Sequence, residues 1–434
     1  MQLCLQSLVE CRWYFLYEAK KMNAQVLTDT EIFKMDSLTV ANTKFAVALF
    51  KKLKERKENE NIFLSPLSIS TALAMVYLGA KGNTATEMAE VLHFDTQGHV
   101  HPRFKELMAA INDRDKPYLL KLANCLFGEE TYTFLNKFQN SVSEFYDSQL
   151  ATVSFQSQPE AARKVINSWV DDKTEGKIQN ILPEGVITPL TKFVLVNAVY
   201  FKGKWNSKFS KNDTYIKSFW LNKRETKPVT MMSQEGEFYF GYIEELQTKV
   251  LELPYVQNEL GLIILLPDSI NDNSTGLEQL EQTLAHDKLL HWTNQANMMK
   301  IKVNVHLPKF KLEDQFHLED VLLAMGMTEA FNPANANFTG MSETNNLFLS
   351  KVIHKSFMEV NEEGSEAAAA TAAIINYRSS LMETKFVADH PFLFFIKHNK
   401  TESILFFGRL SSPGDEVTGF GGADKIMQQV QCYK

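Results

Sequence analysis

The sequence predicts an α+β fold with mostly antiparallel sheets, and three observations support this class. Apolar residues recur at helical spacing through the first third of the chain. From about Phe193 onward they form short runs typical of strands. The 434 residues, 44% of them hydrophobic and 22% charged, suffice for one large core or two smaller ones. Helices followed by many strands, with no Gly/Ser linker between them, indicate an α+β domain.

The helical patterns come first. One helix is expected from Met35 to Leu53. A second follows Ser65, with Pro66 suited to its first turn, and Gly79 and Gly82 break it. Two further helices are expected around Asn136–Tyr146 and Ala161–Lys173.

The strand patterns begin in the middle of the chain. The runs are FVLVNAVYF from Phe193, KVLELPY from Lys249, LGLIILLP from Leu260, IKVNVHLPKFKL from Ile301, PFLFFI from Pro391 and SILFFGRL from Ser403. In the fourth run the apolar residues Ile301, Val303, Val305 and Leu307 alternate with polar ones, which predicts a strand with one buried face.

The two ends of the chain depart from these patterns. Residues 1–34 show no periodic element, and residues 414–434 are Gly-rich at first and polar later. We therefore expect both to be extensions of one domain that spans residues 35–413.

Charge and hydropathy exclude two classes of partner. A formal net charge of -7 argues against general nucleic-acid binding, because phosphate contacts need clustered Lys and Arg. No apolar run approaches the length needed to cross a bilayer, so no membrane partner is expected.

The cysteines and the N-terminus indicate a compartment. Cys4, Cys11, Cys125 and Cys432 fit neither a disulfide framework nor a zinc site, which favours reducing surroundings. The N-terminal stretch lacks a basic leader and makes a poor signal peptide. We expect a cytoplasmic protein, with nuclear entry or release without a signal peptide left open.

No motif of an enzyme is present. The sequence lacks a G-x-S-x-G elbow, an H-E-x-x-H helix, a phosphate-binding loop and a Rossmann glycine pattern. His99 and His101 lie two residues apart in an expected loop without a third ligand, so a zinc site is not expected. We expect no catalytic residue, no cofactor and no metal.

One set of polar residues needs partners. Asn197 lies within the apolar run from Phe193, where an unpaired amide costs on the order of 1–3 kcal/mol. Ser65 and Ser68 flank Pro66 at the start of an apolar helix, and His354 precedes a strand-like stretch. A buried network of Ser65, Ser68, Asn197 and His354 would satisfy all four, although the sequence alone does not show that they meet.

The stretch EEGSEAAAATAAIINYRSS, from Glu362 to Ser380, admits two interpretations. Alanine has the best helix propensity and Ser365 suits an N-cap, so an ordinary helix fits. An extended strand fits too, since alternation gives it one small, uncharged face that includes Ser365. Such a strand could enter between two others without overpacking a core.

Five separated motifs resemble the serpin family, in particular its intracellular ovalbumin-type branch (clade B). They are NIFLSPLSISTALAMVYLGAKGNTATEMAEVL from Asn61, INSWVDDKTEGKIQNIL from Ile166, VNAVYFKGKWNSKF from Val196, KVIHKSFMEVNEEGSEAAAATAA from Lys351 and ADHPFLFFIKHNKTESILFFGRLSSP from Ala388. The resemblance covers residues 35–413. It implies three β-sheets, about eight or nine helices, and an exposed reactive-centre loop at about residues 362–387.

The resemblance also implies a mechanism for that loop. A target serine protease cleaves it as a suicide substrate, a covalent acyl-enzyme forms, and the loop inserts as a new strand in the central sheet. The hinge of the loop is implied at Glu362, Glu363, Gly364, Ser365, Glu366, Ala367, Ala368, Ala369 and Ala370. The small residues then suit a strand that must enter between two others.

Counting from the hinge places the scissile bond at Arg378-Ser379, with Asn376 and Tyr377 tuning selectivity. Proteases that cleave after Arg hold its guanidinium on an acidic residue in their pocket. We therefore expect trypsin-like serine proteases as partners of a monomeric inhibitor. The alternative is a non-inhibitory protein on the same fold, which is merely cleaved or has a storage or binding role.

The resemblance gives mechanical roles to the polar residues. Ser65, Ser68, Asn197 and His354 match the shutter region beneath the point where the sheet strands separate. Trp205 resembles the tryptophan at the breach, where the loop first enters, and Glu362 resembles the hinge-base carboxylate that often forms a salt bridge.

Overall fold

The structure, a computed structural model, describes residues 36–95, 99–112, 116–344, 346–363 and 384–414. Its helices and sheets confirm the predicted α+β class. The α-helices in these ranges are α3 (Ser37–Lys54), α4 (Pro66–Gly79), α5 (Gly82–Leu92), α6 (Val100–Ile111), α7 (Asn136–Tyr146), α8 (Pro159–Lys173), α9 (Glu278–Thr283), α10 (His286–Trp292) and α11 (Glu319–Met325).

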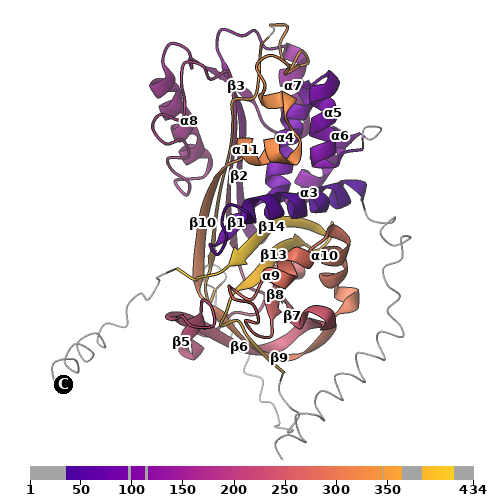
Figure 1. Ribbon diagram of the computed structural model, residues 1–434, viewed down its shortest axis with the longest axis vertical. Coiled ribbons are helices and arrows are strands. Elements are labelled where there is room, and N and C mark those ends of the chain that lie inside the picture. Colours follow the sequence, from indigo (N-terminus) through magenta and orange to yellow (C-terminus); the bar gives the residue numbers. More distant parts are fainter. Residues whose placement is uncertain (1–35, 96–98, 113–115, 345, 364–383, 415–434) are drawn as a thin grey trace, which may run out of the picture.

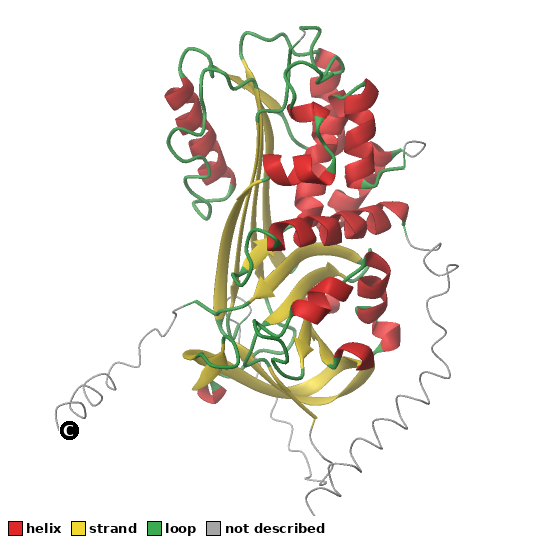
Figure 2. Cartoon of the chain, viewed as in Figure 1, coloured by secondary structure: helices red, strands yellow, loops and turns green. Residues whose placement is uncertain are grey.

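The strands form an elongated framework for these helices. They are β1 (Ile62–Leu64), β2 (Tyr118–Glu129), β3 (Leu150–Val153), β4 (Phe193–Gly203), β5 (Tyr215–Trp220), β6 (Thr226–Ile243), β7 (Thr248–Pro254), β8 (Leu260–Pro267), β9 (Met299–Pro308), β10 (Phe310–His317), β11 (Lys351–Val360), β12 (Thr384–Val387), β13 (Phe392–His398) and β14 (Ser403–Leu410). Figure 1 shows α8 on one side of the long strands and α4 to α7 on the other. Figure 2 shows most other strands curving together at the opposite end of the molecule.

A five-stranded sheet runs along the molecule in the order β10-β11-β4-β2-β3. Its central strands β4 and β11 pair in parallel from Lys351↔Val194 to Met358↔Phe201, and His354 lies opposite Asn197. The sheet is otherwise antiparallel except for β2 and β3. Strand β4 is buried over nearly its whole length, whereas buried and half-buried residues alternate along most of β11.

The second sheet has nine strands and joins β1, β14, β13, β8, β7, β6, β9 and β12, with β5 on the side of β6. The long strand β6 bonds to β5 near its start and to β7 near its end. The resemblance implies three sheets, but hydrogen bonds link the described strands into two. The reason is that β6 runs without a break from the strands around β5 to those around β7.

The predicted second helix is confirmed at its start and at its end. The side chain of Ser65 caps α4 by accepting a bond from Ser68 N–H, and Pro66 occupies the first turn. The helix ends at Gly79, and α5 begins at Gly82. The core covers α4 almost completely, because the helix packs between the two sheets.

Three details differ from the sequence-based expectations. The run from Ile301 is not one strand, because Pro308 ends β9 and β10 continues in the other sheet. The first third also contains β2, whose apolar residues point to both faces and hide its period of two. His101 lies on helix α6 and not in a loop.

Candidate functional site

The four predicted polar residues meet in one buried network at the seam between β4 and β11. Ser65 N–H donates to His354 Nε2 at 3.1 Å, so the other ring nitrogen, Nδ1, carries the proton and donates to Asn197 Oδ1. Asn197 Nδ2 donates to Ser68 Oγ at 2.5 Å. Ser65 Oγ donates to the carbonyl of Leu405 at 2.7 Å, which ties the network to β14.

The sequence suggested that His354 precedes a strand, but the residue lies within β11. Its ring is fully buried and stacks on Phe316 with the ring centroids 6.5 Å apart. Burial lowers the pKa of His354 to about 3, because the cationic ring would lose its hydration without gaining a counter-charge. The imidazole is therefore neutral at pH 7 and acts as both donor and acceptor.

This network is not arranged for nucleophilic catalysis. His354 Nε2 accepts from a backbone amide, and the two serine hydroxyls bond to Leu405 O and to Asn197. A serine nucleophile needs a histidine within hydrogen-bond reach and access for a substrate. Ser65 and Ser68 are almost completely buried, so neither hydroxyl is open to a substrate.

Sequence reasoning missed one member of the network. Asn124 on β2 accepts from Asn197 Nδ2 and so extends the network across the strand next to β4. Near the network, the buried Ser356 on β11 donates its hydroxyl to Phe63 O at 2.9 Å. A polar residue within an otherwise apolar strand was the signal at Asn197, and the same signal at Asn124 could have found it.

Trp205 lies where β4 and β11 end together. Its indole N–H donates to Asn361 O at 2.8 Å, and its backbone N–H donates to Glu363 O at 3.4 Å. The ring stacks on Tyr255 with centroids 4.6 Å apart and is 2% exposed. Trp205 thus fixes the last described residues before position 364.

Glu362 is anchored at the same point. Its carboxylate pairs with Lys309 Nζ at 3.1 Å and accepts from Thr214 Oγ1 at 3.2 Å. Burial raises the pKa of Glu362, but hydrogen bonds from its own backbone amide and from Lys309 outweigh this and hold it below the ordinary value. The neighbouring Glu363 pairs with Lys211 at 2.9 Å.

The last part of the predicted loop, 384–387, is strand β12, and residues 364–383 lie outside the described residues. This applies to the hinge residues Gly364, Ser365, Glu366, Ala367, Ala368, Ala369 and Ala370 and to Asn376, Tyr377, Arg378 and Ser379. The described chain resumes at Thr384 in β12, which pairs in parallel with β9.

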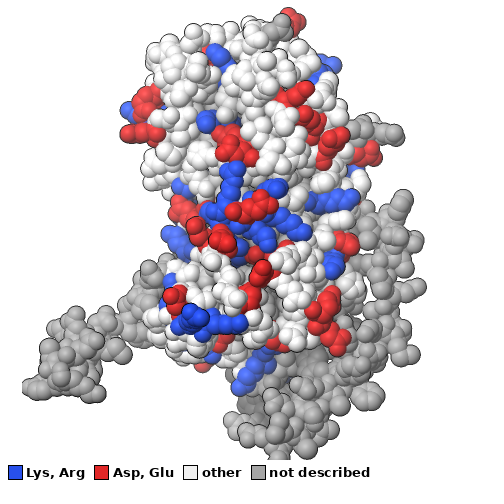
Figure 3. All heavy atoms as spheres, viewed as in Figure 1, with Lys and Arg blue, Asp and Glu red and all other residues white. Residues whose placement is uncertain are grey.

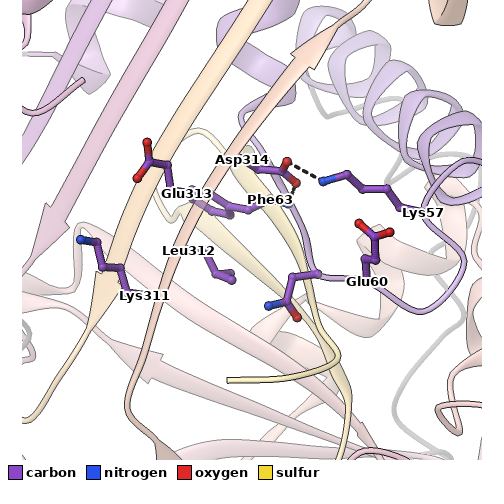
Figure 4. A pocket seen from close by; sticks show the side chains of 8 residues that line it. Lys57, Glu60, Phe63, Lys311, Leu312, Glu313 and Asp314 are labelled. Atoms are coloured by element: carbon purple, nitrogen blue, oxygen red, sulfur yellow. Dashed lines mark hydrogen bonds and ion pairs between the residues drawn. The ribbon is translucent and has the colours of Figure 1, made fainter. Parts of the chain in front are cut away.

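Two hollows lie near the network. One of about 300 Å³ opens between the end of α3 and strands β1 and β10, where Lys57 Nζ pairs with Asp314 Oδ1 at 2.5 Å (Figure 4). Lys57 also lies 4.9 Å from the centroid of the Phe316 ring. The other, about 790 Å³, is bordered by α6, α7, α8 and β2 and is lined in part by Asn124 and Tyr146.

The described residues contain no group of three or more His, Cys, Asp or Glu side chains that could hold a metal ion. His101 Nδ1 bonds instead to the hydroxyl of Tyr146 at 2.5 Å. Within the same ranges, no helix combines the length and the apolar character required to cross a membrane. Cys125 is a free, buried thiol, and burial raises its pKa to about 12.

Comparison with known sequences gives a consistent result. The sequence model of the family described as "Serpin (serine protease inhibitor)" matches residues 40–413. A leukocyte elastase inhibitor of Equus caballus is 52% identical over 379 residues, which are 87% of this chain and 100% of that protein. One of Xenopus laevis is 53% identical over 380 residues, with the same coverage.

Solved structures agree with the sequences. Uncleaved ovalbumin is 39% identical with a TM-score of 0.80, and the match covers 87% of this chain and 100% of that one. Maspin is also 39% identical, with a TM-score of 0.81 and coverage of 87% and 99%.

Proposed function

This chain belongs to the serpin family of serine protease inhibitors, and from that premise we propose that it traps trypsin-like serine proteases as a suicide substrate cleaved at Arg378-Ser379. The observation that carries the proposal is the position of Arg378 at the family's usual distance from a hinge of small residues around Ser365. The described geometry supports it, because both ends of the intervening segment are fixed to the fold.

The chemistry at the bond is that of an ordinary serine protease until the acyl-enzyme has formed. The difference lies in the next step, the hydrolysis of that ester. The protease's serine hydroxyl attacks the carbonyl of Arg378, and Ser379 leaves as a free amine when the acyl ester forms. Insertion of the freed loop into the sheet is a standard example of strand addition. About 14 extended residues span roughly 45 Å, so an inserted loop would carry the acylated protease a long way.

The seam between β4 and β11 is the proposed place of insertion. These strands are parallel neighbours, and the new strand would have to replace their mutual bonds along Lys351–Met358. The pair His354 and Asn197 bridges this seam. We propose that the network around it sets how readily the strands separate.

Arg378 sets the proposed class of target. An Arg side chain pairs well with a carboxylate at the base of a specificity pocket, and a small apolar pocket offers no such partner. The relatives from Equus caballus and Xenopus laevis are named leukocyte elastase inhibitors, which makes leukocyte elastase the second candidate. One substituted residue at the cleaved bond can change the target while the fold stays the same.

A non-inhibitory role is the alternative, because the fold is shared with ovalbumin at a TM-score of 0.80. The hinge separates the two cases. Inhibitory members of the family keep a small uncharged residue at the position of Ser365, which favours inhibition here.

The proposal is tested by mixing the full chain with trypsin and, separately, with leukocyte elastase, followed by a denaturing gel and mass spectrometry. We expect an SDS-resistant complex with trypsin and a released C-terminal fragment that begins at Ser379. Clean cleavage without a complex would assign a substrate on the serpin fold.

Arg378→Ala serves as the matched variant. We expect it to lose the trypsin complex, while its fold and its melting temperature stay as in the parent. Unchanged trypsin inhibition by Arg378→Ala would place the scissile bond elsewhere.

Two further parts of the proposal concern the whole chain. We propose that residues 35–413 form the inhibitor and that residues 1–34 and 414–434 are extensions. We also propose a cytoplasmic location, which the spacing of Cys4, Cys11, Cys125 and Cys432 supports. Cell fractionation tests the location.

A further inference from the structure

Strand β5 presents an uncharged face to solvent. Alternation puts Ile216, Ser218 and Trp220 on one side of β5 and Phe219 on the other, where Phe219 is buried against Val229 and Met231. Ile216 is 50% exposed and Trp220 is 44% exposed, and both belong to the few large apolar residues with such exposure in the described part of the chain. Single exposed apolar residues are common, so the surrounding surface decides whether these two form a patch.

The neighbouring strand extends this face. In the antiparallel pair, Trp220 lies opposite Thr226 and Ser218 lies opposite Pro228 on β6. Residues directly opposite share a face, and Thr226 and Pro228 are exposed as well. We call this uncharged surface of Ile216, Ser218, Trp220, Thr226 and Pro228 the β5 patch.

The β5 patch lies between the two anchors of the proposed loop. Just before β5, Thr214 bonds to Glu362, the anchor on the N-terminal side. At its other end, Trp220 N–H donates to Asp389 O at 2.8 Å, just beyond β12. Lys217 also pairs with Asp389 at 3.3 Å. The strand is therefore connected to both ends of the segment 364–383.

Covalent geometry limits how far a bound protease can be from this surface. Thr384, the first residue of β12, follows Arg378 by six positions, so these two residues are at most about 20 Å apart. A globular domain is about 30 Å or more across. A protease that holds Arg378 is thus large enough to reach past β12 to β5.

The charge around the β5 patch differs in sign from the whole molecule. From Lys202 to Lys227 there are eight Lys or Arg residues and two acidic ones, in a chain whose net charge is -7. Glu363 and Asp389 pair with two of these lysines, so the basic residues still outnumber the acidic ones around the strand. Lys223 and Arg224 are exposed in the turn after Trp220. Figure 3 shows Lys and Arg side chains gathered near the place where Figure 1 labels β5. A partner with acidic residues around an apolar centre would complement this surface.

We propose that the β5 patch is a second docking surface for the target serine protease, contacted while its active site holds the loop. This rests on the proposed function, since it requires a protease at the loop. Exposed aromatic residues on a polar-rimmed surface are typical of interface hot spots. The β5 patch would raise the rate at which the inhibitor captures proteases with an acidic surface beside the active site.

The test measures the second-order rate constant and the stoichiometry of inhibition for the double variant Ile216→Ser/Trp220→Ser. The proteases are a trypsin of acidic isoelectric point, a trypsin of basic isoelectric point, and leukocyte elastase. We expect the rate for the acidic trypsin to fall by about tenfold, as for loss of one hot spot, with unchanged stoichiometry. Stoichiometry should hold because insertion follows acylation and does not involve the β5 patch.

Three more variants keep the test independent of folding. Ser218→Glu adds bulk and a negative charge to the β5 patch without removing any packing, and it should slow capture of the acidic trypsin at least as much. Leu323→Ser, an exposed apolar residue on α11, is the matched control and should leave the rate unchanged. Arg224→Glu should remove the advantage of the acidic trypsin over the basic one.

Each other outcome has one meaning. Parental rates for the double variant and for Ser218→Glu would overturn the docking surface and leave the proposed function intact. A changed stoichiometry would show that the β5 patch acts on the chain's own loop, and loss of a parental dimer in sedimentation would show that it binds a second copy. Both results overturn the proposal. A parent chain that forms no complex with any of the three proteases overturns the proposed function as well.

Discussion

At the scale of the residue, His354 has the most demanding position in the described chain. The side chain is fully buried. One ring nitrogen accepts from the backbone amide of Ser65, the N-cap of α4, and the other donates to Asn197, which only the neutral ring can do. Protonation would place an N–H where Ser65 N–H already donates. The residue therefore holds α4 and the β4–β11 seam together only above the pH at which it would become charged.

The stability of the fold should fall at acidic pH for this reason. The ordinary pKa of histidine is 6.5 and that of folded His354 is about 3, so between these values the unfolded chain binds one proton more. Stability is thus lost as the pH falls from about 6.5 toward 3. His101, whose pKa burial lowers to about 4, adds to the effect in the same direction.

The variant His354→Gln tests this account. At pH 7 we expect its free energy of unfolding to be lower by about 1–3 kcal/mol, because the Ser65 amide loses its acceptor. Between pH 7 and pH 4.5 its urea midpoint should fall less than that of the parent. His317→Gln, at an exposed position on β10, is the control. An equal fall in the parent and in His354→Gln would contradict the assignment.

At the scale of the element, the parallel pair of β4 and β11 is the feature on which the proposed mechanism depends. The face of this seam that carries His354 and Asn197 is buried, so it leaves no water-accessible space for a charged side chain. A strand that enters here needs small, uncharged residues on the face turned to the core. The run from Ser365 to Ala370 has that composition, with Glu366 on the opposite face when extended.

Ser365→Arg should convert the inhibitor into a substrate. The guanidinium at this position would have to enter a dry seam at the first step of insertion, so hydrolysis of the acyl-enzyme should overtake insertion. We expect the stoichiometry of trypsin inhibition to rise several-fold, with cleavage still after Arg378. Leu323→Arg, at an exposed position on α11 outside the loop, is the control for added charge. Equal trapping by Ser365→Arg and the parent would show that the hinge lies elsewhere.

At the scale of the whole molecule, two sheets share one core and the proposed loop joins them. The segment 364–383 leaves the end of β11 in the five-stranded sheet and returns at β12 in the nine-stranded one. A cleavage within it disconnects the two sheets at this point. The five-stranded sheet could then gain a strand between β4 and β11 without a change in the second sheet.

Cleavage alone should therefore stabilise the molecule. A sixth strand would add a ladder of hydrogen bonds and bury the apolar side chains of the inserted segment. We expect the melting temperature, measured by calorimetry, to rise by more than about 10 °C after cleavage of the loop. An unchanged melting temperature would indicate that no strand inserts, and would favour the non-inhibitory alternative.

The sequence by itself determined several of the elements and the family. Helix α4 could be predicted with its start at Ser65 and its end at Gly79, because capping residues and glycines act locally. The same holds for β8, β13 and β14, whose apolar runs match their burial. The order of five motifs was sufficient to indicate the serpin family, which the comparisons show.

Only the tertiary structure decided which residues meet. His354 is 157 residues from Asn197 and 289 from Ser65, and no local pattern encodes such contacts. They arise from the register in which β11 pairs with β4, which the whole core fixes. The division of residues 299–317 between two sheets and the connection of β5 to both Glu362 and Asp389 follow from the same long-range packing.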